Sequence, residues 1–345
     1  MEVYNAEGLV LVEDHIEAAE PDLDYDDVVY HGDAEFEGHI VGLPQKSCTH
    51  QLRYNSDIFE GAGLPTPGEI YWDEGAEAWN WERFIEMGKE ITKDLDGDDQ
   101  PDQYFFDGMG GTLILSTIRS AGGEIFDEQI TKCILTQDEA KEGIRFIGDL
   151  VVEYGIQPPP EIKAGELGIT FTTGRIAVGG ATTCDSVRDL RAGHELPFKW
   201  DFVVPPAGSA GVRVWGDTDQ ITISSSSKHV DEAFEWMVYR SSREAWEDTY
   251  GKGIMMAFSN GPTRWSIFES KAFTEPLGDI DMEMIKEGYK QTIPNPFVPR
   301  CPQPYRVIFT VMTTEVDNVL RGAKSVDQAA ADMCELIDQV LEEGA

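Results

Sequence analysis

Apolar and polar residues alternate along the chain with two different periods. Apolar side chains recur at three- and four-residue spacing in several segments, which we expect to form amphipathic helices: 80–91, 111–119, 139–154, 230–240, 305–320 and 326–342. Short runs rich in β-branched and aromatic residues predict strands at 175–180, 200–204 and 220–227, with a further helix around 186–191. Helices that alternate with short strands indicate an α/β fold.

The stretch GLPQKSCTHQLRYNSDIF, residues 42–59, places several local signals in a row. Gly-Leu-Pro indicates a turn, polar or small residues follow, and LRY resembles a strand. Asn55 and the two residues after it then offer side-chain caps for a helix. In the last segment, Ser325 and Gln328 have the spacing of a capping box. The helix after this box has a predicted buried stripe: Ala329, Ala330, Met333, Ile337 and Leu341.

Length and charge narrow the possibilities further. A chain of 345 residues exceeds the usual size of one hydrophobic core, so we expect two lobes or domains. The chain has 27 Lys and Arg against 64 Asp and Glu, a formal net charge of −37, which argues against a nucleic-acid partner. The acids are scattered along the whole chain, as in proteins adapted to concentrated salt. An extreme halophile is the leading explanation, and an acidic protein from an ordinary source is the alternative.

Cysteine spacing and hydropathy add two expected absences. The five cysteines are widely spaced and lack a CxxC pair, which predicts neither a disulfide framework nor a zinc ribbon, and most are expected to be buried as small apolar residues. The chain has no run of 18 apolar residues, and its first ten residues lack a basic region followed by an apolar one. As given, the chain is expected neither to span a membrane nor to carry an export signal or lipid anchor.

An acidic loop at residues 94–102 has carboxylates at relative positions 1, 3, 5 and 9, as in a calcium-binding EF-hand loop. These candidate ligands are Asp94, Asp96, Asp98 and Asp102. Asp99 occupies the position of the usual glycine, and Phe105 occupies that of the bidentate acid, so a complete EF-hand is excluded. A partial, structural calcium site and a solvated acidic turn both remain open.

Other patterns that could support chemistry are weaker. The glycine-rich segment 107–112 precedes a predicted helix but lacks both a Walker lysine and a GxGxxG motif. A Cys184–His194 dyad could be imagined, with core packing as the alternative, and the 64 acids single out no pair for glycoside hydrolysis. Aromatic residues in predicted loops, including Trp215 and Tyr305, would suit a sugar-like ligand whose faces stack on rings, although each ring could equally be part of a core.

Taken in chain order, six segments resemble the extracellular solute-binding proteins of ABC importers, the family that contains maltose- and other sugar-binding proteins. The resemblance covers nearly the whole chain. The matching segments are LRYNSDIFEGAGLPTP, NWERFIEMGKEITKDLDGDDQPDQYFF, IRSAGGEIFDE, FTTGRIAVGG, ITISSSSKHVDEAFEWMVY and PRCPQPYRVIF with VLRGAKSVDQAA.

This resemblance implies a type II periplasmic-binding-protein-like fold, in which two α/β lobes joined by hinge crossovers close over a solute without catalysis. A membrane permease of the ABC importer would be the partner, and the location would be extracellular and membrane-associated. Carried over by position, residues 1–46 and 213–268 would form the N-terminal lobe and 47–212 the C-terminal lobe. Residues 269–345 would be helices that pack on the C-terminal lobe.

The resemblance also suggests which residues line the cleft. Residues 181–184 stand where the family usually has an aromatic residue, so a stacking platform there is in doubt. Trp215 and Asp217 are the preferred candidates. The full set of candidate ligand-binding residues is Gln45, Lys46, Thr112, Thr183, Cys184, Trp215, Asp217, Tyr305 and Phe309.

Residues 1–8 resemble a stretch that lies later in the family, after about two βα units, so we expect the N-terminal lobe to be incomplete. The solute itself, whether sugar, polyol or glycerol-phosphate-like compound, is left open. Two alternative functions remain: a glycosidase-like enzyme on an α/β scaffold, and a truncated remnant that does not bind.

Overall fold

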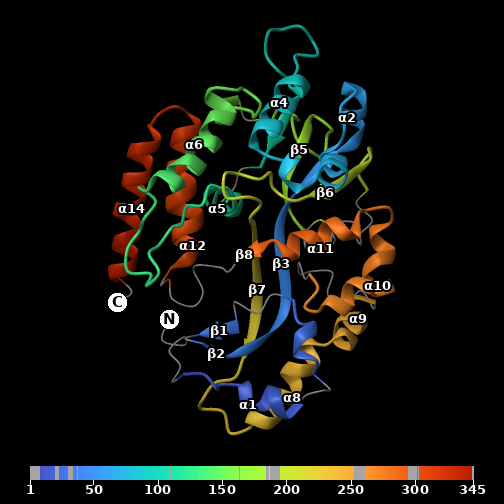
Figure 1. Ribbon diagram of the computed structural model, residues 1–345, viewed down its shortest axis with the longest axis vertical. Helices are drawn as coiled ribbons and strands as arrows, with labels where there is room; N and C mark the ends of the chain where they lie inside the picture. The colour runs from blue at the N-terminus through green and yellow to red at the C-terminus, as the bar shows by residue number, and fades with distance from the viewer. Residues whose placement is uncertain are drawn as a thin grey trace. The chain divides into compact units, whose positions relative to one another are not determined.

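The computed structural model describes residues 8–19, 23–29, 34–36, 38–108, 111–162, 164–183, 186, 195–251, 261–293, 301 and 303–343. The chain is a mixed α/β protein that divides into two compact units (Figure 1). Unit 1 consists of Met1–Thr49, Thr182–Glu195 and Gly216–Arg300. Unit 2 consists of His50–Ala181, Leu196–Trp215 and Cys301–Ala345. The helix expected around 186–191 falls almost entirely outside the described residues.

Three strands carry the chain from one unit to the other: β3 (Gly42–Asn55), β5 (Ile176–Thr182) and β7 (Val214–Thr222). The other strands of the same sheet are β4 (Tyr104–Asp107), β6 (Trp200–Val203) and β8 (Thr292–Ile293). Their order is β4-β5-β3-β7-β8, with β6 paired to β3. The sheet is mixed, because β4 and β5 run parallel whereas β3 and β6 run antiparallel.

The long strand β3 corrects one prediction. Gly-Leu-Pro at residues 42–44 is the start of this strand rather than a turn, and the polar residues after it continue the same strand. Leu52 pairs with Val203 of β6, and Leu43 and Leu52 are both fully buried. The strand ends at Asn55, whose side chain accepts a hydrogen bond from the backbone N–H of Asp57, so the predicted helix cap is confirmed.

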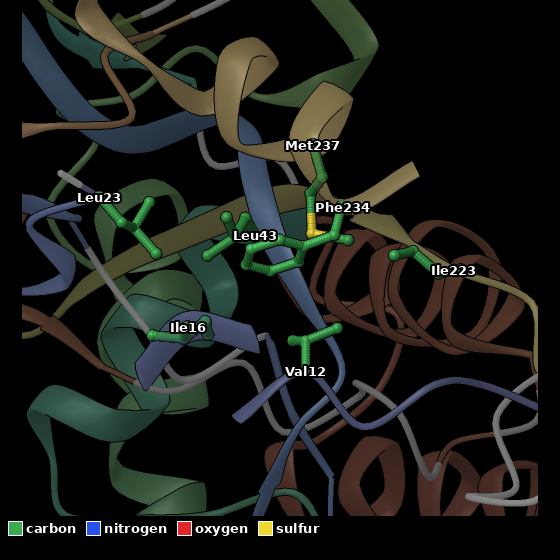
Figure 2. Close-up of a cluster of buried hydrophobic side chains, with 7 residues drawn as sticks. All are labelled: Val12, Ile16, Leu23, Leu43, Ile223, Phe234 and Met237. Atoms are coloured by element: carbon green, nitrogen blue, oxygen red, sulfur yellow. The ribbon is translucent and has the colours of Figure 1, made fainter. Parts of the chain in front are cut away.

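In unit 1, a compact apolar core holds strand β3 against the helices (Figure 2). Its side chains come from segments that are far apart in the sequence and converge on Leu43. The members of this cluster are Val12, Ile16, Leu23, Leu43, Ile223, Phe234 and Met237. The helices of unit 1 are α1 (Glu13–Ala19), α8 (Val230–Ser241), α9 (Arg243–Gly251), α10 (Lys271–Thr274) and α11 (Met282–Lys290), with 3-10 turns at Tyr25–Asp27, Trp265–Glu269 and Glu275–Leu277. A two-stranded sheet is formed by β1 (Glu35–Phe36) and β2 (His39–Ile40).

A buried arginine joins three segments of unit 1. The guanidinium of Arg264 donates hydrogen bonds to the carbonyl oxygens of Leu23 (2.7 Å), Asp24 (3.0 Å) and Ser241 (2.7 Å). It also donates to the hydroxyl of Ser241 at 3.1 Å. Because Arg264 is only 5% exposed, these acceptors replace the water that its charge would otherwise need.

In unit 2, four helices lie side by side (Figure 1): α5 (Gly111–Ser120), α6 (Asp138–Val152), α13 (Thr313–Leu320) and α14 (Val326–Glu343). The predicted stripe of α14 is buried as expected, from Ala329 to Leu341. The remaining helical segments are α2 (Ser56–Ala62), α3 (Pro67–Glu69), α4 (Trp81–Ile91) and α12 (Pro304–Arg306), the π-helical segments Ile70–Glu74 and Val307–Met312, and 3-10 turns at Ala76–Ala78 and Pro160–Ile162. The predicted helix at 305–320 is therefore helical throughout but has a π-helical segment before α13.

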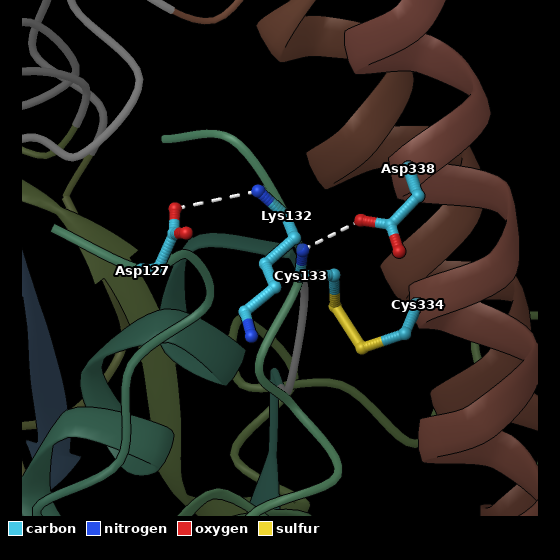
Figure 3. The surroundings of a disulfide bond; sticks show 5 residues. All are labelled: Asp127, Lys132, Cys133, Cys334 and Asp338. Carbon is cyan, nitrogen blue, oxygen red and sulfur yellow. Dashed lines mark hydrogen bonds between the residues drawn. A yellow bond between two sulfur atoms is a disulfide. The ribbon is translucent and has the colours of Figure 1, made fainter. Parts of the chain in front are cut away.

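A disulfide between Cys133 and Cys334 ties α14 to the loop before α6 (Figure 3). The backbone N–H of Cys133 also donates to the carboxylate of Asp338 at 2.6 Å. Cys48 is disulfide-bonded as well, whereas Cys301 is a buried free thiol. The expectation that most cysteines are unpaired was wrong, because cysteines 201 positions apart in the sequence are brought together only by the fold.

The unit boundaries can be set beside the predicted lobes. The chain passes between units after residues 49, 181, 195, 215 and 300, and the crossings at 49/50 and 215/216 lie close to the expected 46/47 and 212/213. Thr182–Glu195, expected in the C-terminal lobe, is grouped with unit 1. Residues 269–293 are grouped with unit 1, whereas the prediction placed residues 269–345 on the C-terminal lobe. The reason is aromatic packing: the ring of Tyr289 lies 5.0 Å from that of Phe268, and its hydroxyl reaches Ser47 of β3. Among the described helices, none has both the length and the apolar composition needed to cross a bilayer.

Candidate functional site

In unit 1, polar side chains from several segments gather beside the middle of β3. We call them the polar cluster: Lys46, Ser47, Thr49, Thr183, Asp217, Asp219 and Tyr289. Successive side chains of a strand point to opposite faces, so Ser47 and Thr49 share one face of β3. Both are 1% exposed. Lys46, one position before Ser47, points to the opposite face of β3, so its charged group and these buried hydroxyls lie on different faces of the strand.

Two glycines allow the backbone to approach closely enough to build this cluster. A side chain at Gly216 in β7 would lie 2.5 Å from Thr292 of β8 and 3.2 Å from the carbonyl of Cys48, so only glycine fits directly before Asp217. A side chain at Gly261 would lie 2.5 Å from the hydroxyl of Tyr289. These close approaches fix the backbone around Asp217 and bring Tyr289 up to β3.

The buried hydroxyls satisfy one another. Thr183 and Thr49 lie 3.1 Å apart through their hydroxyl oxygens, and the backbone N–H of Thr49 donates to Thr183 at 3.2 Å. The hydroxyl of Ser47 lies within hydrogen-bonding distance of the Pro262 carbonyl oxygen. It also lies 3.4 Å from the hydroxyl oxygen of Tyr289. Burial raises the pKa of Tyr289 to about 12, against the opposing effect of its hydrogen bonds to Ser47 and Thr183, so the phenol stays neutral. This set of hydroxyls is uncharged and preorganised.

The charged part of the cluster consists of one cation and two carboxylates. Lys46 Nζ lies 3.1 Å from Asp219 Oδ2, and both side chains are partly exposed. Burial raises the pKa of Asp217 to about 6; the neighbouring Lys46 lowers this pKa, and Asp219 raises it again. The ammonium group has three donors, of which Asp219 takes one. Lys46 and Asp217 can thus offer both donors and acceptors to a hydroxylated ligand.

In unit 2 the candidate residues differ in exposure. Trp215 is buried at 3% exposed, and its backbone N–H donates to Ser116 Oγ at 2.9 Å. Tyr305 and Phe309 are 77% and 51% exposed, and their rings stack with centroids 5.7 Å apart and planes inclined by 23°. An exposed, stacked aromatic pair offers a ring face to a ligand, which Trp215 does not do in its buried position.

The sequence predictions therefore separate into groups. Lys46, Thr183 and Asp217 come together in the polar cluster. Gln45 directly precedes Lys46 on β3. The side chain of Thr112 and all of Cys184 lie outside the described residues. Sequence reasoning missed Ser47, Thr49, Asp219 and Tyr289. Tyr289 in particular is 242 positions from Ser47 and has no local signal beyond its place on an amphipathic helix.

The acidic loop brings three of its four predicted ligands together. Oxygen atoms of Asp94, Asp96 and Asp102 lie within 4.8 Å of one another, while Asp98 is not part of the group. Asp94 accepts backbone hydrogen bonds from residues 96, 97 and 99, and the bond from Gly97 is the main reason why its pKa is lowered. Asp102 is paired with Arg175 at 2.6 Å. These contacts hold the loop in shape, and calcium binding stays a prediction.

Comparison with known proteins assigns the chain to a protein family. Residues 2–245 match the family model described as "Bacterial extracellular solute-binding protein". A binding protein from Brucella abortus is 25% identical over 219 residues, which is 58% of this chain and 46% of that protein, and a relative from Brucella suis gives the same values. The chain thus spans about half the length of the curated relatives that it matches.

Solved structures agree in fold. The sugar-binding protein MalE from Xanthomonas citri superposes with a TM-score of 0.78 at 16% identity, over 97% of this chain and 80% of that one. An ABC substrate-binding protein from Listeria monocytogenes in complex with cycloalternan gives a TM-score of 0.70 at 20% identity, with the same coverage. UgpB from Mycobacterium tuberculosis in complex with glycerophosphocholine gives 0.70 at 16% identity. The predicted type II periplasmic-binding-protein-like fold is therefore confirmed.

Proposed function

Because the chain belongs to the family of bacterial extracellular solute-binding proteins, we propose that it is the substrate-binding component of an ABC importer and binds a neutral, hydroxylated solute such as a sugar. The membrane permease of that importer is the proposed partner. Members of the family are named as binding proteins and not as enzymes, which favours this function over the glycosidase alternative.

The polar cluster is the observation on which the proposed solute class rests. Lys46 supplies donors and Asp217 supplies an acceptor, and the buried hydroxyls of the cluster are neutral. One cation stands beside two carboxylates, Asp217 and Asp219, so an anionic solute would meet net repulsion. A sugar hydroxyl can donate to a carboxylate and accept from an ammonium, which suits this arrangement. Phosphate-bearing solutes are the less favoured class.

Within unit 2, Tyr305 and Phe309 are a proposed apolar contact for such a solute. The faces of a sugar ring carry C–H groups, which pack on aromatic rings and leave the hydroxyls free for polar contacts. Exposure of the pair suits this role, because a stacking ring must be open to the ligand. Phe309 lies in the π-helical segment and Tyr305 in the short helix α12 before it. An ion pair of 2.7 Å between the side chains of Arg306 and Glu343 joins α12 to α14.

The disulfide supports a location outside the reducing cytoplasm. Disulfides persist in oxidising compartments and are rare where glutathione and thioredoxin keep thiols reduced. The bond between Cys133 and Cys334 therefore agrees with the extracellular location that describes the family. We propose an extracellular, membrane-associated location for this protein.

Titration calorimetry in concentrated salt, with neutral sugars, polyols, glycerol 3-phosphate and glycerophosphocholine, tests the proposal. We expect heat of binding with a neutral sugar or polyol and none with the phosphates. Truncating both Tyr305 and Phe309 to alanine should weaken binding by about 1–2 kcal/mol, or five- to thirtyfold. A matched control truncates Trp236 and Tyr239, which are 54% and 44% exposed on α8, and should leave affinity unchanged. Binding of phosphates alone, or equal losses in both double variants, would contradict the proposal.

A further inference from the structure

Unit 2 has a second feature that the proposed solute site does not use, a groove between helices α4 and α6. Its volume is about 500 Å³. The indole of Trp81 lies in this groove and stacks on Phe146, with ring centroids 4.2 Å apart and planes inclined by 11°, and Ile85 lies beside them. The groove thus has an apolar, aromatic floor within one unit. We call it the α4–α6 groove.

Carboxylates line both sides of this floor. Glu82 and Glu86 are four residues apart on α4, and Glu142 and Asp149 are seven residues apart on α6. At a rise of about 1.5 Å per residue, these pairs are separated along their helices by roughly 6 and 10 Å. Two rows of carboxylates therefore face a common groove.

The protein itself neutralises these carboxylates only in part. Among the described residues, none of the four has a basic group within the 4.0 Å of an ion pair. Of the two basic side chains in the lining, Lys89 is directed to the ring of Tyr154, with Nζ 4.6 Å from its centroid. Arg145 is mostly exposed and lowers the pKa of Asp149 only as the smallest effect, while burial and Glu153 raise it. Four acids against two bases leave the groove with a formal charge of 2 − 4 = −2.

From this complementarity we propose that the α4–α6 groove is a docking site for a segment of a partner protein that carries arginine side chains. A guanidinium can bind a carboxylate through two parallel hydrogen bonds and can also pack its flat face on an aromatic ring. The groove offers both kinds of surface at once. It is open to solvent along its length, whereas a small molecule usually needs a pocket that encloses most of its surface. This proposal is independent of the solute bound at the polar cluster.

General attraction to an acidic protein must be separated from this specific site, because the whole chain has a net charge of −37. The matched pair of variants keeps the charge change equal. Glu86→Gln with Asp149→Asn alters the groove, and Glu235→Gln with Glu244→Gln alters exposed acids on α8 and α9 of unit 1. Circular dichroism and thermal melting establish that both double variants are folded.

Fluorescence anisotropy with two labelled helical peptides, one with arginines four residues apart and one with lysines instead, measures docking. The measurement is made in about 0.5 M salt, where the Debye length is only a few ångströms and exposed charges are largely screened. We expect the arginine peptide to bind, the groove variant to weaken it about tenfold, and the α8–α9 variant to weaken it less than twofold. The lysine peptide should bind more weakly, since it cannot form the paired hydrogen bonds.

Four results would overturn the proposal. Equal losses in the two double variants would show that the peptide follows total charge and not the groove. Equal binding of the arginine and lysine peptides would remove the guanidinium from the argument. Absence of binding by the arginine peptide would exclude docking by such a segment. If arginine amide alone bound as tightly as the peptide, the groove would be a site for a small cation instead.

Discussion

Replacing Asp217 by asparagine should make the protein more stable at neutral pH while weakening solute binding. Burial raises the pKa of Asp217 from 3.8 to about 6, so the folded state disfavours the ionised carboxylate by about two pKa units relative to the unfolded chain. At 1.36 kcal/mol per unit, this corresponds to about 3 kcal/mol. Asparagine has the shape of the protonated acid without its titration, so it removes this cost.

The sign of the pH dependence follows from the same two values. Below pH 3.8 Asp217 is protonated in both the folded and the unfolded state, and its substitution should hardly change the free energy of unfolding. Between pH 3.8 and about 6 the unfolded chain loses its proton first, so the stability contributed by the protonated side chain is lost as the pH rises. Above about pH 6 the cost is constant. The stabilisation by asparagine should therefore grow across this window and level off at about 3 kcal/mol.

Urea unfolding of wild type and variant at one fixed salt concentration, repeated between pH 4 and pH 8, gives this difference. The acids that lie far from Asp217 titrate equally in both proteins, so their contributions cancel in the difference. Because a chain of two units need not unfold in one step, hydrogen exchange of peptides from α8 and α11 should report unit 1 by itself. Glu244→Gln, an exposed substitution on α9, should show no pH-dependent difference.

Binding of the solute should change in the opposite direction. A neutral amide replaces a charged acceptor, and loss of a charge-assisted hydrogen bond is worth about 1.5–3 kcal/mol, so affinity should fall at least tenfold at pH 8. A variant that is less stable than wild type at pH 8 would refute the electrostatic reasoning, since Asp217 would then be a net stabilising partner of Lys46. A more stable variant with full affinity would keep the electrostatics but remove Asp217 from the binding site.

Three further substitutions test other parts of the structure. Cys334→Ser should lower the free energy of unfolding by about 2–5 kcal/mol, measured by urea unfolding, because it opens a disulfide that closes a very long loop; Cys133→Ser should match it. Arg264→Met should cost about 3 kcal/mol in thermal or urea unfolding, since buried carbonyls lose their donors, whereas Arg243→Met at an exposed pair should cost less than about 1. Calcium should raise the melting temperature, and Asp94→Asn but not Asp98→Asn should abolish this shift; equal loss in both variants would contradict the assignment.

Local patterns predicted most of the helices. The helices expected at 230–240 and 326–342 are α8 (Val230–Ser241) and α14 (Val326–Glu343), because each places apolar residues at three- and four-residue spacing. The start of β3 was misjudged, since Gly-Leu-Pro has the local signal of a turn. Its neighbours in the sheet override that signal: proline lacks a backbone donor but still fits a strand where its N is not needed for pairing.

The site was predicted only in part, for a physical reason. Lys46 and Asp217 could be found because each lies beside a crossover that the resemblance locates. Tyr289 and Ser47 could not, because a hydroxyl that reaches across 242 positions leaves no periodicity or spacing in the sequence. The same limit applies to the disulfide between Cys133 and Cys334, whose partners are 201 positions apart.

Within the polar cluster, stability and function can be assigned to different residues. The hydroxyls of Ser47, Thr49 and Thr183 are buried but have partners, so they cost little and hold the backbone in place. Asp217 is different, because Lys46 does not offset the cost of its burial and its pKa remains raised. A group that destabilises the fold at neutral pH, and whose pKa is affected by both a cation and another carboxylate, has the electrostatic character of a binding residue more than of a structural one. A hydroxyl of a bound solute can recover part of the free energy lost by burying Asp217, since it supplies a hydrogen bond in place of water.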